Sequence, residues 1–378
     1  MFSGLWAPVL SILAYVALKA LTEIPATIDV AAYDIQTLAM IYVPLAVLHR
    51  IGTTYAVLGT PILKDDIARD PKRYLYVPLA IVAGCVLVAQ GFAFHSAFSF
   101  MPSLHGQLWA FFALAYVMVL WERWHFCAQE FGVLSIYRMR AGQRTAADKK
   151  FDRFYTVVLM LGVNMVLFTA WGFPDVKVVL LYGTPLASAS PELLQPVATC
   201  AFGLGMVLVA VAVIREWTHP QRSVPKALFY LLIGAHTLLL YAFPKAIGLF
   251  FLSYTFHHWM VAVGLFGRVT MRSYGDVPLR ARITKLALGV GPFLAVALLA
   301  YWAFGPLNKA GNLAPVPDAQ LFEGISSGAK IFVGVVVGLF FALNYLHYYY
   351  DRCLYAFSSK AVRENVAPLL LGSPTAGR

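Results

Sequence analysis

Long apolar stretches constrain this chain more than any other feature of its sequence. Residues 74–92, 193–214 and 329–346 carry almost no charge, and about 17–25 apolar residues are enough to cross a lipid bilayer as a helix. The chain is 60% hydrophobic and 12% charged, whereas soluble domains are about 45–50% apolar and about 25% charged. These values exclude an ordinary water-soluble globule and predict an all-α, polytopic membrane protein.

The apolar segments predict a helical bundle with about ten membrane spans. We expect these spans at residues 5–21, 35–48, 74–92, 108–121, 154–171, 193–214, 227–243, 247–266, 286–304 and 329–346. They form a single transmembrane domain over residues 1–365. Residues 366–378, which contain two prolines and two glycines, are expected to be a flexible cytoplasmic tail.

The positions of the basic residues indicate the orientation of the bundle. Alternate loops and the C-terminal tail contain all of the 29 basic residues except Lys19, Lys177, Lys245, Lys309 and Lys330. Because Lys and Arg concentrate in cytoplasmic loops, this alternation predicts that both termini are cytoplasmic. The net charge of +11 then reflects contact with anionic lipid headgroups, and no nucleic-acid partner is expected. We expect a multi-pass protein of the cell membrane, such as a bacterial inner membrane.

Several histidines fall at one predicted depth. Ionisable side chains at membrane depth are costly and tend to mark function. Of the nine histidines, five lie at the predicted cytoplasmic level, on four different helices: His49, His125, His257, His258 and His347. Glu122 and Glu130 add carboxylates near the same level. This convergence predicts a site near the cytoplasmic face.

Three of these positions have a neighbour that could also bind a metal. His125 precedes Gln129 by four residues and His347 precedes Asp351 by four, so each pair shares one helix face. The adjacent residues His257 and His258 point about 100° apart, so one could bind a metal while the other packs or donates a hydrogen bond. Imidazole and carboxylate ligands suit iron, zinc or manganese. The predicted metal ligands are His125, Gln129, His257, His258, His347 and Asp351.

The leading hypothesis from these features is a metal-dependent membrane enzyme of the oxidoreductase type. Iron is the expected metal, because oxidative chemistry on hydrocarbon chains commonly uses it. The expected partners are a membrane lipid or isoprenoid-like apolar substrate and an electron-donor protein. The alternative is a transporter, or a non-catalytic subunit that binds haem, pigment or quinone, with His257 as a candidate axial ligand. No residue is assigned a role as catalytic acid or base.

Two enzyme families share short features with this chain. In the placement of its histidines it resembles the membrane fatty-acid desaturases and hydroxylases, but it has no HxxxH or HxxHH box, so no residue is carried over from them. Met101–His105 resembles the PSxH element of the type-2 phosphatidic acid phosphatases, and His347–Asp351 resembles their HxxxD element. In that family the two elements are close in sequence, whereas here they are far apart. A lipid phosphatase is therefore the lesser alternative.

Small and polar residues inside the spans predict helix–helix contacts. Asn164 is expected to form a hydrogen bond to a neighbouring helix. Gly334 and Gly338 form a GxxxG pattern, and Gly203 and Gly205 lie close together in another span. Glycines at such spacings allow two helix backbones to approach closely, so we expect tight packing at both places.

Overall fold

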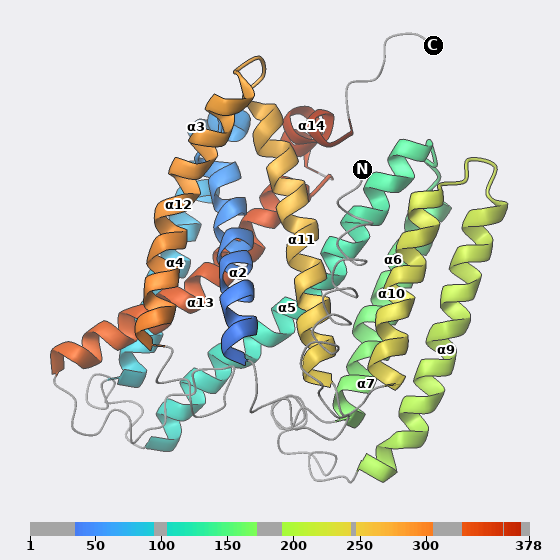
Figure 1. Cartoon of the computed structure of the whole chain (residues 1–378), viewed down its shortest axis with the longest axis horizontal. Coiled ribbons are helices and arrows are strands. Elements are labelled where there is room, and N and C mark those ends of the chain that lie inside the picture. The colour runs from blue at the N-terminus through green and yellow to red at the C-terminus, as the bar shows by residue number, and fades with distance from the viewer. Residues whose placement is uncertain are drawn as a thin grey trace. The chain divides into compact units, whose positions relative to one another are not determined.

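The computed structural model describes residues 35–93, 104–171, 191–242, 247–304, 327–357 and 359–371, which are almost entirely helical and include no strand (Figure 1). This confirms the all-α class. The predicted span at residues 5–21 lies outside the described residues, and each of the other predicted spans falls on a helical segment.

Three described helices are long and apolar enough to cross a membrane: Lys72–Gln90, Leu194–Thr218 and Val224–Ala242. The helix at Leu194–Thr218 exposes an apolar face that includes Leu204, Val207 and Val211, as expected for contact with lipid. These helices are compatible with a membrane protein, while the count of ten spans stays a prediction.

The chain divides into two compact units. The first contains the described part of Glu122–Gly264. Its elements come from α5 (Leu104–Ala141), α6 (Ala146–Thr156), a π-helical segment (Val157–Val163), α7 (Asn164–Trp171), α9 (Pro191–Thr218), α10 (Val224–Ala242) and α11 (Ile247–Ser273). In this unit α9 packs against both α7 and α10 (Figure 1).

Local sequence signals explain where α5 ends and α6 begins. Gly142 has a positive φ of 81°, and the N–H groups of Gly142 and Gln143 donate to the carbonyls of Met139 and Arg138. This is the Schellman arrangement, in which glycine adopts the left-handed conformation that ends a helix. The Thr145 hydroxyl then accepts a hydrogen bond from the Asp148 N–H at 3.1 Å, which caps the first turn of α6.

The second unit contains Ile35–Trp121 and the described part of Leu265–Arg378. Besides parts of α5 and α11, it contains α2 (Ile35–Leu58), a 3₁₀ turn (Pro61–Leu63), α3 (Lys64–Arg69), a π-helical segment (Lys72–Tyr76), α4 (Val77–Ala93), α12 (Leu279–Phe304), α13 (Ser327–Tyr355), a second π-helical segment (Val362–Val366) and α14 (Ala367–Leu371). In this unit α13 packs against α4 and α2, and α2 also packs against α12.

The packing of α13 on α4 confirms the expectation for the GxxxG pattern. A Cβ atom added at Gly338 would lie 2.5 Å from the Cα of Val86, and one added at Gly334 would lie 2.9 Å from the Gln90 side chain. Of the other two glycines, Gly205 packs against the π-helical segment at 157–163, whereas no atom of another described segment lies within 4 Å of a Cβ added at Gly203. The tight-packing prediction is therefore wrong for Gly203.

Two further contacts bear on the sequence expectations. Asn164 on α7 accepts a hydrogen bond from the Thr237 hydroxyl on α10 at 2.8 Å, which confirms its predicted role between helices. The tail that we expected to be flexible from residue 366 contains α14, and Arg268 and Arg272 donate hydrogen bonds to the Leu370 and Leu369 carbonyls. Residues 372–378 lie outside the described residues.

Candidate metal centre

Helices α5 and α11 each contribute one histidine to the candidate site. His125 and His258 are both buried, and their rings meet edge to face with centroids 5.0 Å apart. The ring of Phe126 lies 4.0 Å from that of His258. The two imidazoles are therefore held in an apolar, aromatic environment.

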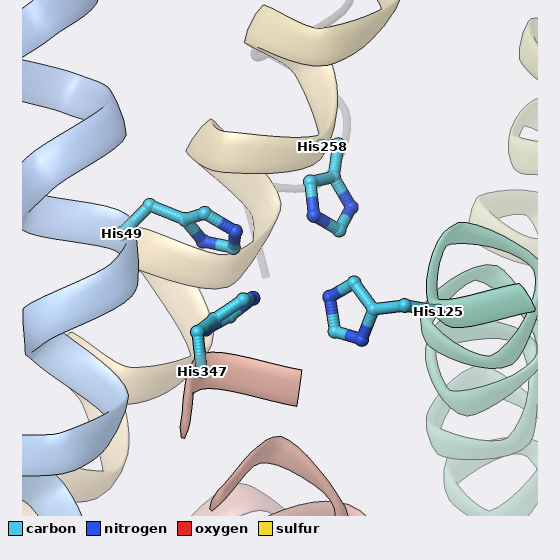
Figure 2. A group of neighbouring side chains, drawn as sticks. All are labelled: His49, His125, His258 and His347. Carbon is cyan, nitrogen blue, oxygen red and sulfur yellow. The ribbon is translucent and has the colours of Figure 1, made fainter. Parts of the chain in front are cut away.

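Helices α2 and α13 contribute a second pair. The rings of His49 and His347, both buried, have centroids only 3.9 Å apart and an interplanar angle of 61°. Figure 2 shows the two rings close together, His49 on α2 and His347 on α13. Two neutral imidazoles at this separation are compatible with a shared ligand, whereas two imidazolium cations would repel each other.

A hydrogen-bond chain orients His347. The Thr53 hydroxyl donates to the Asp351 carboxylate at 2.8 Å, and its oxygen lies 3.3 Å from Nδ1 of His347. Since the single hydroxyl proton is directed at Asp351, the Thr53 oxygen accepts the proton of His347 Nδ1–H, and the lone pair of this ring is then on Nε2. Histidines that bind metals typically donate their second N–H in this way.

Four buried histidines form a group that could hold a metal ion. One ligand atom from each of His49, His125, His258 and His347 lies within 4.8 Å of the others (Figure 2). Neutral imidazole is a good ligand for zinc, copper, iron and nickel. The donor set therefore fits a transition-metal ion and does not by itself select one.

The predicted ligands occupy different places around this group. His125, His258 and His347 belong to it, whereas His257 does not: its Nε2 lies 3.6 Å from the Glu130 carboxylate. Neighbouring positions on a helix cannot face one point, so α11 can direct only one of its two adjacent histidines to the group.

Gln129 and Asp351 lie beside predicted histidine ligands. Gln129 is buried one turn after His125, and neither amide atom has a hydrogen-bond partner among the described residues. Asp351 is also buried, with one oxygen 3.6 Å from Nε2 of His347. This contact confirms that His347 and Asp351 share a helix face. Asp351 is not a member of the four-histidine group, whereas Gln129 as a ligand stays a prediction.

Sequence reasoning missed His49 as a ligand candidate. It noted that His49 lies at the same depth as the others but selected histidines with a second potential metal ligand beside them in sequence, and His49 has only Thr53 one turn further along. Its predicted membrane depth, shared with the other histidines, was the one sequence signal that could have identified His49 as a ligand. Thr53 was missed because its partners lie almost 300 residues further along the chain.

The two phosphatase-like elements are described only in part. Residues 101–103 and the side chain of His105 lie outside the described residues, whereas His347 and Asp351 both lie on α13.

No family model, curated protein or solved structure matches the chain. The candidate site is therefore described from its own geometry alone.

Proposed function

We propose that this protein is a membrane metalloenzyme in which His49, His125, His258 and His347 bind one transition-metal ion. The observation that carries the proposal is the mutual approach of four buried imidazoles from four helices. A shared ion would use one lone pair from each of the four rings.

The number of histidines bears on which metal would support catalysis. A tetrahedral zinc ion would have all its positions filled by four histidines, as in structural sites, whereas catalytic sites keep one position open. An ion that accepts six ligands would keep two positions open. We therefore propose iron, which would supply oxidative chemistry for an apolar lipid or isoprenoid-like substrate, with electrons from a donor protein.

The residues around the group have distinct proposed roles. Thr53 and Asp351 hold the His347 ring in one tautomer through the hydrogen bonds described above. The Gln129 amide offers a donor and an acceptor that no described residue uses, so it could orient a bound substrate. Phe126 excludes water beside His258. Each of these contributions orients a ligand or lowers the local dielectric.

The competing cofactor is haem. A haem iron already receives four nitrogen ligands from its macrocycle and takes at most two more from the protein, one on each face. Four imidazoles within 4.8 Å of one another leave no room for the macrocycle between them. This geometry favours a bare ion over haem.

Elemental analysis of the detergent-purified protein, together with its visible spectrum, tests the proposal. We expect bound iron without a haem Soret band, and loss of metal in His49→Ala and in His258→Ala. His219→Ala is the matched control, because His219 lies in the turn after α9 and contacts Asp148 instead. Bound zinc as the native metal would contradict the oxidative role, and full metal retention in both variants would contradict the site itself.

A further inference from the structure

Helix α6 divides its charges between two faces. Asp148 and Asp152, four residues apart, are buried, whereas Lys149, Lys150 and Arg153 are exposed. Side chains three or four residues apart on a helix are neighbours, so the three basic side chains share the outer face of α6, which we call the basic face. The acidic residues of this helix therefore point into the unit and the basic residues point out of it.

The two aspartates do not neutralise the basic face, because each has a basic partner elsewhere in the unit. Asp148 lies 2.7 Å from the Arg215 guanidinium on α9, and Asp152 lies 3.0 Å from the Lys226 ammonium on α10. Within the residues that the structure describes, no salt bridge reaches the basic face. Its positive charges are therefore available to a partner outside the chain.

Exposed aromatic residues lie at the same end of the unit. Phe154 directly follows the basic face and is 55% exposed, and Trp217 near the end of α9 is 57% exposed. The Arg222 guanidinium lies 5.9 Å from the centre of the Trp217 ring. Because the ion pair between Asp148 and Arg215 holds the start of α6 beside the end of α9, the aromatic and basic residues mark one level of the unit.

The surface of α9 changes its character at this level. Exposed residues before Trp217 include the apolar Val207 and Val211, whereas the exposed residues Gln221 and Arg222 follow it. Trp concentrates at the interface between a bilayer and water, and Lys and Arg place their charged ends there while their stems cover apolar surface. The basic face therefore lies where the headgroups of a bilayer would begin.

We propose that the basic face of α6 binds the headgroups of anionic phospholipids. Phosphate oxygens carry negative charge and accept hydrogen bonds from ammonium and guanidinium groups, and basic residues next to a membrane span attract anionic lipid. The proposal rests on the membrane location within the proposed function. It does not involve the metal site, and it assigns lipid binding to one defined surface of the protein.

The competing occupant of this surface is an acidic soluble protein. Such a partner would also be attracted to the positive charges. However, Phe154 lies four residues after Lys150 on the same outer face, and a polar partner would leave its ring against charged groups. Insertion of this ring among lipid chains gives it an apolar environment, so the surface fits a lipid better.

Lipid titration of the full-length protein in a non-ionic detergent tests the proposal. Phosphatidylglycerol and phosphatidylcholine with identical acyl chains are the probes, so a difference between them reports on the headgroup. The unfolding temperature as a function of lipid concentration gives an apparent Kd for each lipid. We expect the wild type to bind phosphatidylglycerol more tightly than phosphatidylcholine.

The variants replace the basic face by neutral residues. A basic residue near an anionic membrane surface strengthens binding about fivefold, so Lys150→Gln should weaken phosphatidylglycerol binding about fivefold. The triple variant Lys149→Gln, Lys150→Gln and Arg153→Gln should weaken it at least about tenfold. Phosphatidylcholine binding should not change in either variant.

A second triple variant removes the same amount of charge from another exposed segment. Lys64, Arg69 and Lys72 are also exposed, but aspartates at positions 65, 66 and 70 lie among them, so residues 64–72 carry no net charge. Replacing these three basic residues by Gln should change phosphatidylglycerol binding little. Because all the substituted side chains are exposed, each variant should unfold at the wild-type temperature when no lipid is added.

Three results would overturn the proposal. The first is wild-type affinity for phosphatidylglycerol in the α6 triple variant, and the second is an equal loss in the control triple variant, which would make net charge the cause. The third is tighter binding of polyglutamate than of phosphatidylglycerol at the basic face, which would assign the face to an acidic protein. His258→Ala should lose metal but keep its phosphatidylglycerol affinity, so failure of the metal site and failure of the lipid site are distinguishable.

Discussion

The Thr53 hydroxyl donates a hydrogen bond to the buried Asp351 carboxylate at 2.8 Å, although the two residues are 298 positions apart in the chain. The same oxygen lies 3.3 Å from Nδ1 of His347. Thr53 therefore connects a ring on α13 to a carboxylate one turn further along the same helix. This chain of contacts presents Nε2 of His347 as the ligand atom.

The first prediction follows from that contact. Thr53→Val keeps the shape of the side chain but removes the hydroxyl, so His347 loses its hydrogen-bond acceptor. We expect metal affinity to fall about 10–100-fold, the usual effect of losing a residue that orients a ligand. Competition with a chelator of known affinity measures the change. Thr53→Ser retains the hydroxyl and should bind metal nearly as well as the wild type; equal loss in both variants would show that packing, not hydrogen bonding, matters here.

Much of the fold could be predicted because it depends on local sequence. The apolar segments coincide with helices, and the contact of Asn164 with Thr237 follows from placing one amide in an apolar span. Gly203 shows the limit: its spacing to Gly205 resembles a packing pattern, but only Gly205 meets another segment closely. Which face of a helix meets a neighbour depends on the rest of the fold.

The candidate site, like the fold, was predictable from the sequence only where local spacing along one helix determines it. Depth selected His125 and His347, and the helical period correctly placed Asp351 beside His347. The helical period could not select His49, whose contact with His347 joins two helices that are far apart in the chain. Nor could it find the Glu130–His257 contact, because Glu130 was recognised only as a carboxylate at about the right level. Contacts between distant segments leave no local pattern.

The second prediction concerns the acid stability of the α6 N-terminus. Burial alone would raise the pKa of the Asp148 carboxyl, but the hydrogen bond from Thr145 and the charges of His219 and Arg215 outweigh burial and lower it. The Arg215 guanidinium lies 2.7 Å from the carboxylate. Because the folded-state pKa is depressed, the stabilisation is fully present above the unfolded-state pKa of about 3.9 and is lost as the pH falls through the folded-state value.

Asp148→Asn should therefore lower the unfolding temperature at pH 7, and the difference from the wild type should shrink as the pH falls below about 4. Thermal unfolding followed by circular dichroism between pH 7 and pH 3 measures this. Asp276→Asn is the control, since Asp276 is exposed and should change little at any pH. A difference that stays constant across the range would contradict the electrostatic explanation.

The third prediction concerns a buried lysine in the first unit. The Lys226 ammonium lies 3.0 Å from Asp152 and 3.2 Å from Glu216, and it donates to the Gln143 side-chain oxygen at 2.9 Å. Lys226→Met removes the cation that these two buried carboxylates share. Breaking a buried ion pair from one side costs about 3–5 kcal/mol, so we expect the free energy of unfolding to fall by roughly that amount.

Chemical unfolding of the detergent-solubilised protein measures the loss. Lys360→Met provides the comparison, because Lys360 is 80% exposed and lies 3.9 Å from Glu364. An exposed pair of this kind contributes about 0–1 kcal/mol. If both variants lose the same small amount, the network around Lys226 does not stabilise the fold as its burial implies.

The last prediction tests the close approach of α13 to α4. A methyl group at Gly338 would lie 2.5 Å from the Cα of Val86 and 3.0 Å from the carbonyl oxygen of Cys85. These are backbone atoms, so the methyl group can be accommodated only if the two helices move apart. We expect Gly338→Ala to lower the free energy of unfolding by about 1–3 kcal/mol, as overpacking of a well-packed contact does.

Helix propensity alone predicts the opposite sign, because alanine stabilises a helix by about 0.5–1 kcal/mol relative to glycine. Gly84→Ala on α4 isolates that effect, since no described atom beyond its own stretch of helix lies within 4 Å of the added Cβ, and it should leave the protein equally stable or more stable. The two variants carry the same chemical change on two helices of one unit. A stabilising Gly338→Ala would mean that α13 and α4 are not held at the separation that Gly338 permits.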